Sequence, residues 1–223
     1  MTPEEAWEQI RFSDRREAGR KLAERLLPLA YENPLVIALP RGGVPVAREV
    51  ALALHAPLDF VTVRKLGAPH NPEYGIGALA EGGVRQIDPE AVAILGLSHG
   101  VVDEIVAHES TELERRAARY RGGRAPLNVS GHTAIVVDDG VATGVTDSAA
   151  LRVVRRRGPR RLVLAVPVCP PDSARRLREE ADEVVTLQLP PNFFGVGQFY
   201  EDFSQVPDEE VAAVLAEFHR ATV

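Results

Sequence analysis

The sequence contains 223 residues, of which 45% are hydrophobic and 26% are charged, and its formal net charge at pH 7 is −6. This length and composition predict one ordinary soluble domain, while the acidic balance gives no electrostatic argument for nucleic-acid binding. A single cysteine excludes an intrachain disulfide. No apolar run approaches the ~18 residues of a membrane span, and the acidic N-terminus has no secretory hydrophobic region. We therefore expect a cytoplasmic protein.

The first third of the chain predicts helices that alternate with short apolar strands. Helices are expected over residues 3–31 and 44–54, where apolar residues recur at helical spacing. Strands are expected over residues 34–40 and 58–63, because short continuous apolar runs are typical of strands covered on both faces. Residues 64–87 are rich in glycine and proline, and we expect a long loop there with room for a short hairpin.

The rest of the chain continues the alternation. Asp88 followed by Pro89 predicts the start of a helix over residues 88–95, and Ser98 is placed to cap a longer charged helix over residues 101–121. The further expected elements are strands over 133–137, 161–168 and 183–188, helices over 145–157, 172–181 and 208–220, and an irregular segment over 189–203.

This order of elements predicts an α/β fold with a doubly wound, mostly parallel sheet. We find no internal repeat, low-complexity tract or linker that would divide the chain. We therefore expect a single domain over residues 1–223.

The stretch from Ala134 to Thr146, AIVVDDGVATGVT, places two carboxylates directly after a buried strand. In a parallel sheet, ligands bind at the carboxyl ends of the strands, which is where Asp138 and Asp139 fall. The loop after them leads into a helix, whose N-terminal N–H groups and dipole favour a phosphate. Gly144 allows the backbone to approach an anion closely, and threonine hydroxyls add donors. A phosphate site beside two acids that could face a diol or Mg²⁺ describes a site for a ribose 5-phosphate.

Two other interpretations of these motifs stay open at this point. The acids could merely cap the strand end, with residues 140–144 forming a plain turn. The segment GLSHG, residues 96–100, matches the Gly-x-Ser-x-Gly motif of α/β hydrolases, in which Ser98 would be the nucleophile. That nucleophile follows a strand, whereas residues 88–95 carry the signals of a helix, so we favour Ser98 as a helix cap.

The segment IVVDDGVATGVT resembles the signature of the type I phosphoribosyltransferases, in which a hydrophobic strand, two acids and a threonine-glycine loop follow one another. The resemblance implies the type I phosphoribosyltransferase fold, the substrate phosphoribosyl pyrophosphate (PRPP) and Mg²⁺. It implies that the catalytic candidates Asp138 and Asp139 contact the ribose hydroxyls. Mg²⁺ would be bound mainly through PRPP, with the same two acids as candidate protein ligands. The loop implied to wrap the 5-phosphate consists of Ala142, Thr143, Gly144, Val145 and Thr146.

Three further stretches resemble the family in the expected order, so that the resemblance covers roughly residues 30–190. ALPRGG, residues 38–43, resembles the pyrophosphate loop, in which Arg41 supplies charge and Gly42 and Gly43 expose N–H groups. Beyond the second strand, Arg64 and Lys65 would reach the pyrophosphate, and Lys65 is a further catalytic candidate. Residues 66–83, which include His70, match the place of a mobile catalytic loop.

The acceptor is less constrained by the resemblance. In the 6-oxopurine members the first residue of the phosphate loop is an aspartate that serves the base, whereas this chain has Ala142. This departure disfavours hypoxanthine and guanine and leaves orotate-like, adenine-like or unusual acceptors. Asp147, beside the phosphate loop, is a second departure, and we expect it to face solvent.

A hood formed by the chain ends covers the base in this family. The candidate hood here is residues 190–205 together with the terminal helices. Phe193, Phe194 and Tyr200 could stack on an acceptor ring, or they could instead pack inside the hood.

We therefore expect a Mg²⁺-dependent phosphoribosyltransferase of nucleotide metabolism, similar to bacterial predicted phosphoribosyltransferases of unassigned acceptor. It would transfer ribose 5-phosphate from PRPP to a nitrogen of a nucleobase-like acceptor and release pyrophosphate. A homodimer is compatible with this expectation. The alternative is a regulatory protein that senses PRPP without turnover, against which Arg41, Lys65 and the glycine-rich loop argue.

Overall fold

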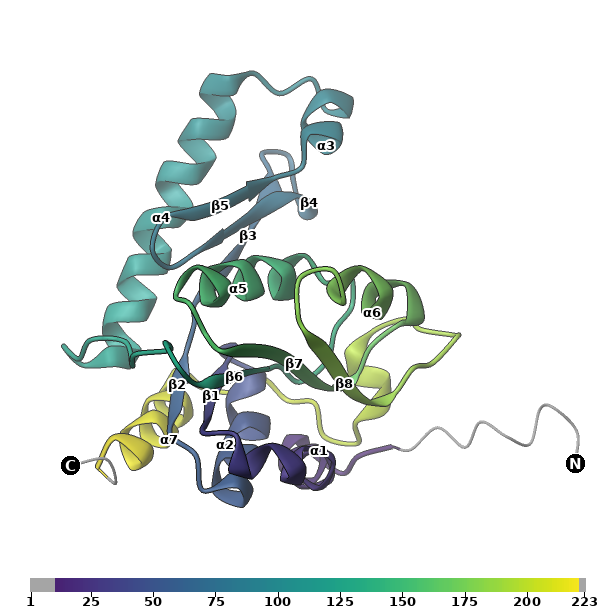
Figure 1. Cartoon of the computed structure of the whole chain (residues 1–223). Coiled ribbons are helices and arrows are strands. Elements are labelled where there is room, and N and C mark those ends of the chain that lie inside the picture. The colour runs from purple at the N-terminus through teal and green to yellow at the C-terminus, as the bar shows by residue number, and fades with distance from the viewer. Residues whose placement is uncertain (1–10, 221–223) are drawn as a thin grey trace, which may run out of the picture.

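A computed structural model of the chain describes residues 11–220, and its centre is a five-stranded sheet (Figure 1). The strands lie in the order β2-β1-β6-β7-β8, and each pairs in parallel with its neighbour. Their bounds are β1 (Pro34–Ala38), β2 (Leu58–Phe60), β6 (Thr133–Val137), β7 (Arg161–Val168) and β8 (Glu183–Gln188). The expected α/β fold with a mostly parallel sheet is confirmed.

Helices cover both faces of this sheet. On one face lie α1 (Arg15–Leu26), α2 (Gly43–Leu54) and α7 (Asp208–Arg220), and on the other lie α5 (Val145–Arg156) and α6 (Pro171–Leu177) (Figure 1). Side chains of β1 alternate between the two cores, since Val36 packs toward α1, α2 and α7 while Ile37 packs toward α5 and α6. The strands are therefore unbroken apolar runs in the sequence. Within residues 11–220, no helix is both long and apolar enough to cross a membrane.

Residues 63–87 form a second sheet, which corrects the expectation of a long loop there. β3 (Val63–Ala68), β4 (Asn71–Ala80) and β5 (Val84–Ile87) pair antiparallel in that order, and we call them the flap sheet. It packs against α3 (Pro89–Ile94) and α4 (His99–Arg121); in Figure 1 the flap sheet and α3 stand above α5, and α4 runs down beside them toward β2. A Cβ on Gly77 would lie 2.2 Å from the carbonyl oxygen of Gln86. Glycine in this segment thus permits close strand pairing, and it is not only a loop signal.

Two helix caps expected from the sequence are confirmed. The Asp88 side chain accepts hydrogen bonds from the N–H groups of Glu90 and Ala91 at 3.0 and 3.1 Å, which starts α3. The Ser98 hydroxyl accepts from the N–H of Val101 at 3.4 Å and caps α4. Because Ser98 joins two helices, it is not on the strand-to-helix turn that a hydrolase nucleophile needs.

The helix expected over residues 3–31 is shorter among the described residues. α1 begins after Asp14, whose side chain accepts from the N–H of Glu17 at 2.7 Å. A 3-10 helix, η2 (Leu27–Tyr31), replaces the last turn, because Pro28 has no N–H to donate. Residues 3–10 of the expected helix lie outside the described part of the chain.

Residues 190–205, the hood candidate, lie against the segment that precedes α1. The N–H of Phe12 donates to the carbonyl of Phe199 at 2.8 Å, and the N–H of Glu201 donates to the carbonyl of Phe12 at 2.8 Å. A short 3-10 helix, η3 (Val196–Phe199), forms part of this segment. The start of α1 and the stretch before α7 therefore sit side by side, although nearly the whole chain separates them in sequence.

A buried ion cluster joins the flap sheet to the main sheet. Arg121, at the end of α4, donates to Asp59 of β2 at 3.1 Å and to Glu81, just after β4, at 2.8 Å. The exposed fractions of the Arg121, Asp59 and Glu81 side chains are 10%, 4% and 10%. The Arg121 guanidinium also lies 4.2 Å from the ring of Phe60. This cluster fixes the position of the flap sheet, because a buried charge is tolerated only beside its partner.

Candidate functional site

The site lies where the strand order reverses, between β1 and β6. The chain leaves β1 toward α2 and leaves β6 toward α5, so the two connecting loops start side by side and diverge to opposite faces. The N–H of Leu39 donates to the carbonyl of Val137 at 2.9 Å, which continues the pairing into the loops. Open parallel sheets bind ligands at such a switch point. The fold therefore brings residues 39–43 and residues 138–144 together.

Gly42 and Gly43 allow these two loops to touch. A Cβ on Gly42 would lie 1.9 Å from a carboxylate oxygen of Asp139, and one on Gly43 would lie 2.6 Å from the carbonyl oxygen of Val137. A side chain at Gly42 would displace the Asp139 carboxylate, and one at Gly43 would displace the backbone of the second loop. The sequence suggested that the glycines expose N–H groups, and the contact between the loops is an additional reason for them.

The two adjacent acids have different surroundings. Asp138 is half-buried, and its carboxylate accepts the N–H of Asp139 at 2.8 Å. Burial, reinforced by the charges of Asp139 and Asp147, raises the pKa of Asp138 well above its usual range. Asp139 is buried and forms an ion pair with Arg15 of α1 at 2.7 Å. Burial raises the pKa of Asp139 as well, although the Arg15 guanidinium opposes this shift.

The loop from Ala142 to Thr146 has the geometry of an anion site. The carbonyls of Ala142 and Thr143 accept hydrogen bonds from Ser173 at 2.7 Å and Arg176 at 3.1 Å, both on α6. A trans peptide holds its C=O and N–H in opposite directions, so the N–H groups of Thr143 and Gly144 point away from α6. Together with the N-terminus of α5, they form a set of donors suited to a phosphate.

Gly144 has φ +76°, a backbone conformation that side chains of L-residues rarely adopt. A Cβ at Gly144 would lie 3.2 Å from the Leu177 side chain, between the loop and α6. The sequence suggested that a side chain here would hold the anion away. The structure corrects this reason, because the side chain would face Leu177 and the requirement for glycine comes from the backbone angle.

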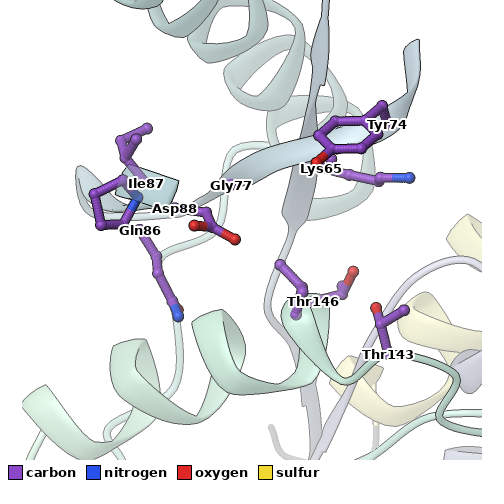
Figure 2. A pocket seen from close by; sticks show the side chains of 11 residues that line it. Lys65, Tyr74, Gly77, Gln86, Ile87, Asp88, Thr143 and Thr146 are labelled. Atoms are coloured by element: carbon purple, nitrogen blue, oxygen red, sulfur yellow. The ribbon is translucent and has the colours of Figure 1, made fainter. Parts of the chain in front are cut away.

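A cavity of about 480 Å³ lies between the loop 142–146 and the flap sheet (Figure 2). One wall consists of Thr143, Val145 and Thr146 at the start of α5. The other wall consists of Lys65, Tyr74, Gly75, Gly77, Gln86, Ile87, Asp88 and Pro89. Figure 2 shows the side chains of Lys65 and Thr146 on opposite walls. Residues far apart in the sequence thus place hydroxyls, an ammonium group and a carboxylate around one space.

Lys65 and Arg64 face opposite sides of β3. Lys65 lines the cavity, and its side chain passes over Gly75, where a Cβ would lie 2.8 Å from the lysine Cε. Arg64 instead donates to Glu109 of α4 at 2.7 Å. Successive side chains of a strand point to opposite faces, so when Lys65 points into the cavity, Arg64 points away from it. We therefore correct the expectation that Arg64 reaches the pyrophosphate.

Arg41 follows β1 at the edge of the site and points toward α7. Its guanidinium lies 3.7 Å from Asp208, and its side chain is 27% exposed. Asp208 is the first residue of α7, and its carboxylate accepts hydrogen bonds from the Tyr120 hydroxyl at 2.5 Å and from Arg119 at 2.8 Å. The Arg41 side chain is thus oriented toward α7.

The three hood aromatics expected to stack on an acceptor differ in burial, and only Tyr200 is built into the protein interior. Tyr200 is 1% exposed, and its hydroxyl donates to the carbonyl of Asp139 at 2.6 Å. Phe193 is partly buried, and its ring lies 5.9 Å from that of Phe199 in a stacked arrangement. Phe194 is 96% exposed. The burial of Tyr200 therefore corrects its assignment to the acceptor, while the roles of Phe193 and Phe194 stay predictions.

Asp147 is buried, which corrects the expectation that it faces solvent. Only 4% of the residue is exposed, and its Oδ1 has no hydrogen-bond partner among the described residues. Burial raises the pKa of Asp147 to about 7. The side chain lies in the first turn of α5, directly behind the phosphate loop.

The buried Asp147 predicts a fall in stability as the pH rises. Folding raises the pKa of Asp147 from 3.8 to about 7, so the folded protein favours the protonated carboxyl. The stability that this protonation contributes is fully present below pH 4 and is lost between pH 4 and pH 7. We therefore compare the free energy of unfolding of Asp147→Asn with that of the unmodified protein. The difference between them should shift in favour of the variant by roughly 2–4 kcal/mol between pH 4 and pH 8. Urea unfolding at both pH values measures this. Asp172→Asn, an exposed acid in the first turn of α6, should show no such gain, and an equal difference at both pH values for Asp147→Asn would contradict the assignment.

Comparisons with known proteins agree with this geometry. Residues 14–204 match the family model described as phosphoribosyl transferase domain. The chain is 48% identical over 209 residues to two Mycobacterium tuberculosis proteins, named putative phosphoribosyl transferase Rv0571c and MT0597, in an alignment that covers 94% of this chain and 47% of each relative. It thus spans about half the length of these curated relatives. It is also similar to TT1426 from Thermus thermophilus, whose crystal structure has a TM-score of 0.79 and 48% identity, with 93% of this chain and 99% of that chain covered.

Proposed function

The chain belongs to the phosphoribosyl transferase family, and we propose that it is a Mg²⁺-dependent enzyme that transfers ribose 5-phosphate from PRPP to a nitrogen of a nucleobase-like acceptor. The observation that carries this proposal is the cavity in which Thr143, Val145 and Thr146, from the loop 142–146, face Lys65 of the flap sheet. A phosphate-binding helix N-terminus opposite a lysine suits a ligand with an anionic group at each end.

The loops suggest how PRPP would lie. The N–H groups of residues 142–146 would bind the 5-phosphate, and Asp138, which is more exposed than Asp139, would accept from the ribose hydroxyls. Arg41, Gly42 and Gly43 would hold the pyrophosphate from the β1 side, and Lys65 would do so from the flap sheet. The reacting C1 atom then lies between two loops that the fold already holds in contact.

The residues at this site fit Mg²⁺ that arrives with the substrate. Among residues 11–220, no group of three or more histidine, cysteine, aspartate or glutamate side chains could hold a metal ion alone. Mg²⁺ usually takes one or two carboxylates and completes its coordination with phosphates and water. Asp138 is the carboxylate in a position to contribute, because Asp139 is already paired with Arg15. When bound, Mg²⁺ would neutralise charge on the pyrophosphate.

The chemistry would depend on positioning and charge. The acceptor nitrogen forms a bond to C1 while the bond from C1 to the pyrophosphate oxygen breaks, and the pyrophosphate takes the electron pair. Arg41 and Lys65 would stabilise the negative charge that grows on the leaving group. The two loops would hold C1 and the acceptor in reacting geometry. Ala142, in place of an aspartate, favours an acceptor other than hypoxanthine or guanine.

The direct test is PRPP-dependent pyrophosphate release across a panel of nucleobases, with Lys65→Ala beside Arg64→Ala. Lys65→Ala should lower kcat/KM roughly 10- to 150-fold, since a lost charged hydrogen bond is worth about 1.5–3 kcal/mol. Arg64→Ala removes the neighbouring cation, which faces α4 and not the cavity, so it should change kcat/KM less than about threefold. PRPP binding without release from any base would favour the regulatory alternative, and equal losses in both variants would refute the role of Lys65.

A further inference from the structure

Arg15 connects the first helix to the acidic motif. Its Nε donates to Asp139 Oδ2 at 2.7 Å across 124 positions of sequence, and its Nη1 donates to the carbonyl of Ser204 at 2.8 Å. The guanidinium also lies 4.0 Å from the ring centre of Phe203. The side chains of Arg15 and Asp139 are 11% and 13% exposed. This arginine is therefore held in one orientation by the hood and by the motif at once.

Asp139 is held equally firmly on its other side. The Oδ2 atom that accepts from Arg15 is also the atom that a Cβ on Gly42 would meet at 1.9 Å. The main-chain carbonyl of Asp139 accepts the Tyr200 hydroxyl at 2.6 Å. The Asp139 carboxylate thus lies between the Arg15 guanidinium and the Gly42 backbone, which leaves little of it to contact a ligand.

We propose that Arg15 and Asp139 are positioning residues, and that Asp138 alone accepts from the ribose hydroxyls. Arg15 holds the Asp139 carboxylate against Gly42 and so sets the distance between the loop 39–43 and the loop 138–144. This inference rests on the proposed function, in which PRPP spans both loops. Because PRPP must engage both loops at once, it depends on their spacing, whereas pyrophosphate or ribose 5-phosphate needs one loop only.

The experiment measures the affinity of three ligands by calorimetry, namely PRPP with Mg²⁺, ribose 5-phosphate and pyrophosphate with Mg²⁺. Arg15→Gln and Asp139→Asn should each weaken PRPP about tenfold or more and change the two fragments less than about threefold. The double variant should be no weaker than either single variant, because both changes break one interaction. Arg15→Lys should restore most of the PRPP affinity. Asp138→Asn should instead lose ribose 5-phosphate together with PRPP.

Two further variants separate positioning from general damage. Arg16→Gln, the neighbouring residue in an exposed pair with Glu210 at 3.4 Å, should leave all three affinities unchanged. Gly42→Ala displaces the Asp139 carboxylate from its place between Arg15 and the loop 39–43, and it should weaken PRPP far more than ribose 5-phosphate.

The proposal is overturned if Asp139→Asn loses ribose 5-phosphate as completely as Asp138→Asn, because Asp139 would then contact the ribose directly. It is also overturned if Arg15→Gln binds PRPP as well as the unmodified protein does. An unmodified protein that binds none of the three ligands would refute the proposed function, so the two failures are distinguishable.

Discussion

Gly144→Val should reduce the affinity for ribose 5-phosphate and for PRPP by about 100-fold or more. Gly144 has φ +76°, which a β-branched residue cannot adopt without strain, so the loop must change its path. The N–H groups at the start of α5 would then no longer converge on the phosphate. Losing two hydrogen bonds to a charged group costs about 3–6 kcal/mol, which corresponds to at least roughly 100-fold in affinity. Calorimetry with ribose 5-phosphate measures the effect directly.

Gly158 provides the matched control at the other end of the same helix. It has φ +72°, and a Cβ there would meet nothing within 4 Å. Gly158→Val introduces the same kind of backbone strain, so thermal unfolding should show a loss of stability in both variants. Affinity for ribose 5-phosphate should fall in Gly144→Val alone. If Gly158→Val binds as poorly, the loss reflects general destabilisation, and the loop would no longer be assigned to the phosphate.

Arg121→Leu should lower the free energy of unfolding by about 3–5 kcal/mol, because it leaves Asp59 and Glu81 buried without their shared partner. Arg157, whose guanidinium lies 3.6 Å from Glu81, compensates only one of the two acids. For a domain of this size, that loss corresponds to a fall in Tm of roughly 6–20 °C. Chemical denaturation and thermal unfolding both report it.

Arg115, on the same helix, is the control for this change. It pairs with Glu112 at 3.0 Å, but the two side chains are 62% and 36% exposed. Exposed pairs contribute about 0–1 kcal/mol, so Arg115→Leu should have little effect on stability. Adding Asp59→Asn and Glu81→Gln to Arg121→Leu should recover part of the loss. Equal destabilisation by Arg115→Leu and Arg121→Leu would show that burial of the cluster does not matter.

The elements that the sequence predicted well are those whose signals are local. The strand over residues 133–137 is an unbroken apolar run, and its bounds match those of β6. Asp88 and Ser98 cap helices through N–H groups two or three residues away. The acidic motif and its loop occupy one short segment, so their place at a strand end could be inferred before any long-range contact was known.

Side-chain direction could not be inferred in the same way. Arg64 and Lys65 are adjacent cations, and which of them faces the cavity depends on the register of β3 with β4 and on where α4 packs. The flap sheet was predicted only as a long loop with room for a short hairpin, because glycine and proline in a short window are typical both of loops and of closely paired strands. The residue type of Tyr200 is compatible with stacking on a ligand. Its burial could not be inferred, because its hydroxyl donates to the Asp139 carbonyl across 61 positions of sequence.

The amino-acid sequence alone was enough to place the two acids, the loop 142–146 and the loop 39–43 after parallel strands, because periodicity and motif order are properties of short segments. The pairing of Arg15 with Asp139 and the contact of Asp139 with Gly42 had no sequence signal. An ion pair between residues 124 positions apart exists only because α1, the hood and the switch point are packed together. Burial then makes the two neighbouring acids unequal, since desolvation depends on the neighbours that folding supplies and not on residue type.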